Sequence, residues 1–133
     1  MTAEEKYTYW LELARYDLET ADSMFSTGRW FYVVFMCQQA IEKLCKGLFT
    51  LYIGDNVPKI HNIKTMFSRF KDKLNCTVSE DTFVFFDTLS AHYLTYRYPD
   101  FENEPNNRTE KIEASEVIKK TNEVFSWLLT LKP

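Results

Sequence analysis

The longest apolar stretch of the chain, residues 30–52, repeats its hydrophobic positions at the spacing of an α-helix. At 3.6 residues per turn, one column of side chains is apolar throughout, and the next column is apolar except for Gln38 and Glu42. The remaining side carries three polar residues: Gln39, Lys43 and Lys46. A helix with so wide an apolar face has to be covered by several partners. The pattern therefore predicts a central helix around which the rest of the chain packs.

Four other segments also show helical periodicity. The first follows a capping-box pattern, Thr2 with Glu5, and is expected to end near Ser26, just before Gly28. Three more helices are expected over residues 62–74, 80–96 and 112–131. The link between the first two helices is short, so the second is expected to fold back antiparallel to the first. The sequence predicts an all-α, antiparallel up-and-down bundle of four long helices plus one shorter helix, in a single domain over residues 1–133.

Composition supports this fold class and excludes several others. Only three Gly and four Pro favour long helices over a turn-rich β-protein, and 45% hydrophobic content excludes disorder. The polar residues within 30–52 exclude a membrane span, and the acidic, polar N-terminus lacks a signal pattern, so we expect a cytoplasmic protein that does not enter a membrane. The net charge of −3 is not that of a typical nucleic-acid binder.

The cysteines and histidines give little indication of a metal or a cofactor. Cys37 and Cys45 lie in the central helix and are expected to be small buried hydrophobes, because no C-x-x-C spacing is present. His61 and His92 have no H-E-x-x-H or Gly-rich phosphate pattern around them. We expect His61 to be a helix cap or a packing residue and His92 to be half-buried in the fourth helix. No cofactor and no metal site is expected.

Gln38 and Glu42 interrupt an apolar column and therefore need partners. An unpaired buried polar group costs roughly 1–3 kcal/mol. One interpretation is structural: Glu42 pairs with Lys46 one turn on, and Gln38 bonds to a neighbouring helix. The other interpretation is a polar pocket between helices of the kind that bundles use for ligands.

The end of the fourth helix is the second candidate site. Arg97 is flanked by Tyr96 and Tyr98 and is followed by Pro99 and Asp100. The arginine can pair with the carboxylate and fix the turn, or it can present its planar donors to a phosphate beside aromatic rings that stack on bases. Taken alone, the pattern favours the structural turn.

Four segments in chain order carry a family resemblance. They are Trp10 with Ala14-x-x-Asp17-Leu18-x-x-Ala21, then Cys37-Gln38-Gln39-Ala40-x-Glu42-Lys43-x-x-Lys46, then His61-Asn62-Ile63, and last Tyr96-Arg97-Tyr98-Pro99-Asp100. Together they resemble the HEPN family, the small helical "higher eukaryotes and prokaryotes nucleotide-binding" domain. The pairing of the Gln-Gln-Ala-x-Glu-Lys run with the Arg-Tyr-Pro-Asp run is the most specific part of the match.

The resemblance implies a helical bundle that is usually a homodimer. It also implies frequent pairing with a minimal nucleotidyltransferase protein, often as a toxin–antitoxin couple, and the binding of a nucleotide or RNA. On this basis the candidate ligand- or partner-binding residues are Gln38, Gln39, Glu42, Lys43, Lys46, Tyr96, Arg97, Tyr98 and Asp100.

The sequence departs from the family's catalytic pattern. Many members of the wider family are metal-independent ribonucleases with an arginine followed, after four to six residues, by a histidine at the dimer cleft. The matching arginine is Arg97, and the positions of that histidine hold Glu102, Asn103 and Glu104. Acidic side chains repel a phosphate and cannot replace an imidazole as acid or base near neutral pH. We therefore expect a binding module, with a ribonuclease that uses Arg97 and a pure scaffold as the alternatives.

Overall fold

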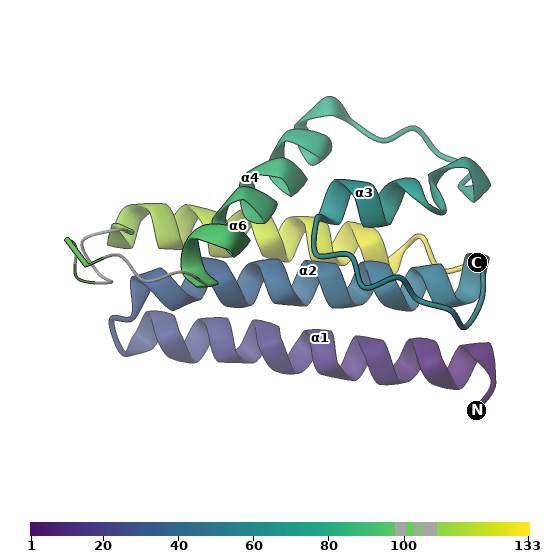
Figure 1. The fold of residues 1–133 in the computed structure, drawn as a ribbon, viewed down its shortest axis with the longest axis horizontal. Helices are drawn as coiled ribbons and strands as arrows, with labels where there is room; N and C mark the ends of the chain where they lie inside the picture. Colours follow the sequence, from purple (N-terminus) through teal and green to yellow (C-terminus); the bar gives the residue numbers. More distant parts are fainter. Residues whose placement is uncertain (98–100, 103, 105–108) are drawn as a thin grey trace.

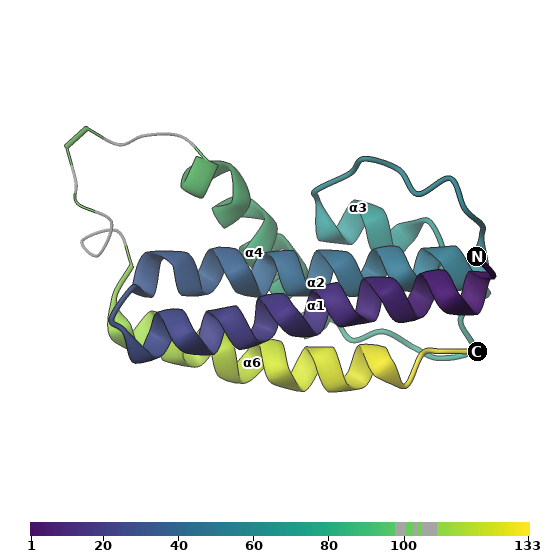
Figure 2. The ribbon, with the colours of Figure 1, turned by 90° about the horizontal axis from the view of Figure 1, so that it is seen from below.

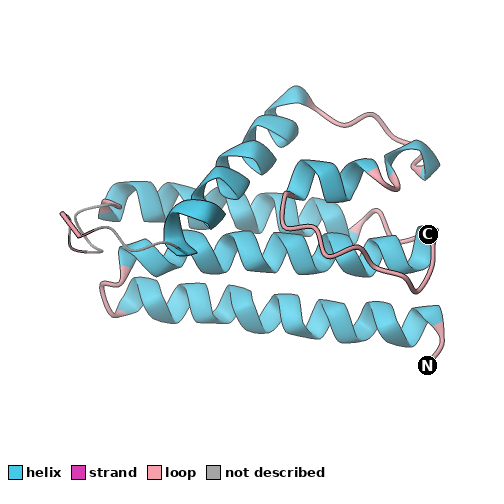
Figure 3. Ribbon diagram, in the orientation of Figure 1, coloured by secondary structure: helices cyan, strands magenta, loops and turns pink. Residues whose placement is uncertain are grey.

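The structure is a computed structural model that describes residues 1–97, 101–102, 104 and 109–133; within α4 it describes residues 94–97 by their backbone alone. Its helices are α1 (Ala3–Ser26), α2 (Trp30–Tyr52), α3 (Ile63–Ser68), the 3₁₀ turn η1 (Lys71–Lys73), α4 (Glu80–Arg97) and α6 (Lys111–Leu129). No strand occurs in the described part of the chain (Figure 3). The predicted all-α fold class is confirmed.

Helix α2 is the element that the others cover. It packs against α1, α3, α4 and α6, and 15 of its 23 residues are buried, compared with four in α1. Figures 1 and 2 show α1, α2 and α6 with nearly parallel axes, while α4 crosses α2 at an angle and α3 lies beside it. The four long helices alternate in direction along the chain, as the sequence predicts.

Local signals in the sequence set several helix ends. The Thr2 hydroxyl accepts a hydrogen bond from the Glu5 N–H at 3.1 Å, and the Glu5 carboxylate accepts one from the Thr2 N–H at 3.2 Å, which completes the predicted capping box. Gly28 follows α1 with a φ of 75°, a left-handed conformation that favours glycine. The reversal at Gly28 lets α2 return antiparallel along α1.

The third helix, α3, is shorter than the sequence predicts, which was residues 62–74. It ends at Ser68, and a separate 3₁₀ turn follows Phe70, whose ring is fully buried and stacks on Tyr52 with centroids 5.9 Å apart. The apolar spacing identified which residues are buried. It could not show that the α-helical hydrogen bonds stop, because the same residues face inward in either conformation.

The described helices do not include one that has both the length and the apolar content needed to cross a lipid bilayer. The polar residues of α2 interrupt its apolar face, as the sequence indicates.

Cys37 and Cys45 are fully buried and Cys76 is exposed. Burial raises the pKa of the Cys37 thiol to about 12 and raises the pKa of Cys45 as well, because a thiolate is poorly solvated in the core. The thiolate is the reactive form, so the native chain is expected to show one fast-reacting thiol with Ellman's reagent near pH 8 and three after denaturation. A Cys76→Ser variant should lose the fast phase. Rapid labelling of two or more thiols in the native protein would contradict this core.

Gly47 lies at a close contact between α1 and α2. A Cβ at this position would lie 3.0 Å from Trp10 Cβ and 3.3 Å from Tyr7 Cδ2. Alanine gains about 1 kcal/mol of helix propensity over glycine, but overpacking of a filled core costs about 1–3 kcal/mol. Because Trp10 Cβ is fixed to the backbone of α1, we expect Gly47→Ala to lower the free energy of unfolding by about 1 kcal/mol in urea titrations. Ser115→Ala, at an exposed position of α6, is the control and should be neutral or stabilising. A stabilised Gly47→Ala variant would show that the two helices can separate at no cost.

Candidate functional site

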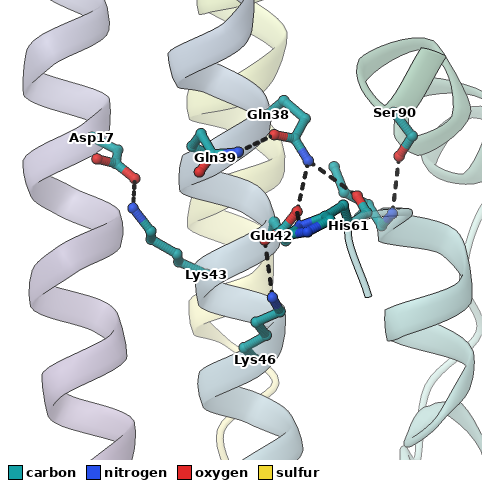
Figure 4. A network of polar contacts seen from close by, with 9 residues as sticks. Asp17, Gln38, Gln39, Glu42, Lys43, Lys46, His61 and Ser90 are labelled. Atoms are coloured by element: carbon teal, nitrogen blue, oxygen red, sulfur yellow. Dashed lines mark hydrogen bonds and ion pairs between the residues drawn. The ribbon is translucent and has the colours of Figure 1, made fainter. Parts of the chain in front are cut away.

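The polar residues of the α2 column form one connected network. Gln38, Glu42 and Lys46 lie one turn apart and are 0%, 4% and 7% exposed. Gln38 Nε2 donates a hydrogen bond to Glu42 Oε1 at 2.9 Å, and Lys46 Nζ lies 3.1 Å from Glu42 Oε2 (Figure 4). The predicted pairing of Glu42 with Lys46 is confirmed. Both carboxylate oxygens of Glu42 are therefore satisfied within the core.

The network also holds the segment that precedes α3. Gln38 Nε2 donates a second hydrogen bond to the carbonyl oxygen of His61 at 3.1 Å, and His61 Nδ1 lies 3.2 Å from Glu42 Oε1. The carboxylate thus selects the tautomer of a neutral imidazole in which Nδ1 carries the proton. Figure 4 shows the His61 ring beside Glu42 and the His61 carbonyl toward Gln38. Both the ring and the backbone of His61 are fixed by α2.

The orientation of the Gln38 amide is determined by its surroundings. Its two N–H protons meet two acceptors, and its Oε1 accepts a hydrogen bond from Gln39 Nε2 at 2.7 Å. A flipped amide would place its oxygen against the Glu42 carboxylate and the His61 carbonyl, which is repulsive. Gln39 therefore acts as the outermost support of the network.

Lys43 does not join this network. Its ammonium group pairs with the carboxylate of Asp17 on α1, and the two side chains are 25% and 9% exposed (Figure 4). The helical spacing explains the difference, since Lys43 follows Glu42 by one position and points to another side of α2. The Asp17–Lys43 pair links α1 to α2.

Aromatic rings and a cavity adjoin His61. Its ring stacks on Tyr93 of α4 with centroids 4.7 Å apart, and Tyr93 stacks on Phe35 of α2 at 6.1 Å. Ser90 Oγ, one turn before Tyr93, accepts a hydrogen bond from the Ile63 N–H at 2.9 Å. A cavity of about 210 Å³ is lined by His61, Asn62, Ser90 and Tyr93.

The structure brings together some of the candidate residues and not others. It joins Gln38, Gln39, Glu42 and Lys46, and it separates Lys43 from them. The candidates Tyr98 and Asp100 lie outside the described residues, as do the side chains of Tyr96 and Arg97. The pairing of Arg97 with Asp100 therefore stays a prediction.

His61 has a larger role than the sequence predicts. Asn62, not His61, caps α3, since Asn62 Oδ1 accepts a hydrogen bond from the Thr65 N–H at 2.9 Å. The other expectation, that His61 is a packing residue, is confirmed, since its ring stacks on Tyr93. The contact with Glu42 was missed, although the His61-Asn62-Ile63 motif is part of the family resemblance. His92 is half-buried as expected, with 27% of its side chain exposed.

The described residues contain no group of three or more His, Cys, Asp or Glu side chains placed to hold a metal ion. The one carboxylate–imidazole contact of the α2 column, Glu42 with His61, has no third such ligand beside it in that part of the chain.

The Glu42–Lys46 pair can be tested by a double-mutant cycle. Removing one partner of a buried ion pair leaves an unpaired charge in the core and costs about 3–5 kcal/mol. We expect Glu42→Gln and Lys46→Met each to lose about 3 kcal/mol of unfolding free energy in urea, and the double variant to lose less than the sum by about 2 kcal/mol. The same cycle at Asp17 and Lys43 is the control and should give a smaller coupling, because Lys43 is more exposed. Additive losses at Glu42 and Lys46 would contradict a coupled pair.

Two solved structures resemble the fold across nearly its whole length. The crystal structure of TT1696 from Thermus thermophilus is 22% identical in sequence, with a TM-score of 0.80 over 94% of this chain and 97% of that chain. The crystal structure of ST0689, an archaeal HEPN homologue, is 21% identical, with a TM-score of 0.73 over 100% of this chain and 99% of that chain. At these identities the likeness shows the fold alone.

The sequence also matches a family model directly. Among curated proteins none matches the chain. The model described as HEPN domain matches residues 7–131, which include every segment of the resemblance described above. The chain therefore belongs to the HEPN domain family.

Proposed function

We propose that this HEPN domain is a binding module that forms a homodimer and acts with a minimal nucleotidyltransferase partner in a toxin–antitoxin-like couple. In this proposal it engages a nucleotide or RNA where α2, the start of α3 and α4 meet. The observation that carries the proposal is the polar network of the α2 column, whose accessible end is His61, beside a cavity of about 210 Å³. Ligand sites in helical bundles are commonly built from inward-facing side chains of facing helices.

The network has a feature that a purely structural role does not require. Gln38, Glu42 and Lys46 satisfy one another inside the bundle, so they could stabilise it without His61. They nevertheless fix the ring of a residue whose side chain is 46% exposed. A positioned, accessible imidazole beside a cavity supports ligand binding.

The outer face of α1 has features that support the proposed binding of a protein partner. Tyr9 and Tyr16 are two turns apart on α1 and are 56% and 69% exposed, with Glu5, Glu12 and Glu19 exposed around them. Tyrosine is enriched in protein interfaces because it offers a large contact area with a polar end. The carboxylates favour a partner surface that carries positive charge.

The oligomeric state and ligand binding can be tested with the purified chain. We expect a dimer by light scattering, and a higher melting temperature in the presence of a nucleotide such as AMP. A ligand at about ten times its Kd stabilises the native state by about 1.4 kcal/mol, which raises the melting temperature of a chain of this size by about 5 °C. A monomer whose melting temperature no nucleotide changes would contradict the proposal.

The partner can be tested by co-expression with the protein encoded by the neighbouring reading frame. We expect a stable complex, and at least tenfold weaker binding by a Tyr9→Ala, Tyr16→Ala double variant, because each truncated interface tyrosine costs about 1–2 kcal/mol. The melting temperature of this variant should not change, since both side chains are exposed. Lys119→Ala, at an exposed position of α6, is the surface control. RNA breakdown by the isolated chain that Arg97→Ala abolishes would favour the ribonuclease alternative over a binding role.

A further inference from the structure

A ligand in the cavity cannot touch Gln38 or Glu42, the two polar residues that interrupt the apolar column of α2. Gln38 is 0% exposed and Glu42 is 4% exposed, whereas 46% of the His61 side chain is accessible. His61 is the network residue that lines the cavity, so Gln38 and Glu42 can act on a ligand there only through His61. The buried residues then act as positioning residues for this imidazole.

The position of the imidazole leaves one ring nitrogen for a ligand. Nδ1 is directed at Glu42, and one face of the ring is covered by Tyr93, so Nε2 is the polar atom that remains. When the ring is protonated, both nitrogens donate hydrogen bonds, and Nε2 becomes a charged donor beside the cavity.

Two further donors line the same cavity. Asn62 Oδ1 is used in capping α3, so its amide protons are left for another acceptor. Ser90 Oγ accepts the Ile63 N–H, and a hydroxyl in that role still has a proton to donate. An imidazolium, an amide and a hydroxyl form a donor set suited to a group that offers only acceptors.

The charges around His61 favour an anion once the ring is protonated. Glu42 is the one carboxylate in contact with the imidazole among the described residues, and it is paired with Lys46. Tyr93 of α4 covers one face of the ring. On α3, the charged residue closest to His61 in sequence is Lys64, and Lys64 pairs with Asp87 of α4. The Glu42–Lys46 pair is neutral, so protonation of His61 leaves one net positive charge at the cavity.

We propose that the cavity beside His61 binds a phosphate group, whose oxygens accept hydrogen bonds from His61 Nε2, the Asn62 amide and the Ser90 hydroxyl. The inference rests on the proposed function, because it identifies which part of a nucleotide or an RNA strand the site holds. A nucleobase is the poorer occupant, because a base edge presents donors as well as acceptors.

The first experiment follows the two histidines of the wild-type protein by NMR during titrations with inorganic phosphate, AMP and adenosine. The ring signals of His61 should move with phosphate and with AMP but much less with adenosine. The signals of His92 should stay unchanged and provide the internal control. Equal shifts of His61 with adenosine and AMP, or no shift with either phosphate compound, would overturn the assignment.

The second experiment compares matched histidine variants. His61→Gln should weaken AMP binding at least tenfold, and Ser90→Ala should weaken it several-fold, while His92→Gln should bind as the wild type does. Inorganic sulfate offers the same acceptor oxygens without a base or a sugar. It should bind the wild type and His92→Gln equally, and it should bind His61→Gln at least tenfold more weakly. Equal binding of sulfate by His61→Gln and the wild type would contradict the role of His61. If His61→Gln does not fold, the wild-type titrations decide.

The outcomes separate this inference from the proposed function. If nucleotides bind and dimers form but His61 does not respond to phosphate, the phosphate assignment is wrong and the binding module stands. If phosphate and sulfate move His61 while no nucleotide, RNA or partner binds, the anion site stands and the proposed function is wrong.

Discussion

Glu42 places a carboxylate in the middle of α2, the most apolar helix, and the charge of this carboxylate has to be neutralised within the core. Taking an ion out of water costs several kcal/mol, and the attraction of a partner offsets this only with good geometry and further hydrogen bonds. Glu42 has both: Lys46 supplies the opposite charge, and Gln38 and His61 supply the additional contacts. The polar column of α2 is stable in the core because its members satisfy one another.

The same requirement connects elements that are far apart in the sequence. Gln38 and Glu42 together fix both the backbone and the ring of His61, which lies two residues before the first residue of α3. Tyr93 then covers the ring from α4, and Ser90 accepts the first N–H of α3. Helix α4 and the segment that leads into α3 are therefore both in contact with one side chain, that of His61. The cavity lies at this meeting point.

The arrangement changes how the family's motifs are understood in this protein. The Gln-Gln-Ala-x-Glu-Lys run is largely internal, and its lysines have separate roles, since Lys43 links α2 to α1 and Lys46 neutralises Glu42. The exposed functional group of the network is the imidazole of His61, which comes from His61-Asn62-Ile63, a motif too short to identify the family on its own. The proposed binding through a positioned imidazole and neighbouring donors is consistent with the sequence, in which Glu102, Asn103 and Glu104 occupy the positions where the resemblance would place a ribonuclease histidine.

The sequence by itself determined the all-α class, the extents of the long helices and the buried cysteines, and it offered the Glu42–Lys46 pair as one of two interpretations. These depend on local spacing: the apolar period, caps such as Thr2 with Glu5, and contacts one helical turn apart. Only the tertiary structure decided that α3 ends at Ser68, that Lys43 pairs with Asp17, and that His61 meets Glu42 across 19 residues of chain. Such contacts depend on how helices and loops pack in three dimensions, and the periodicity of one helix carries no information about its partner's position.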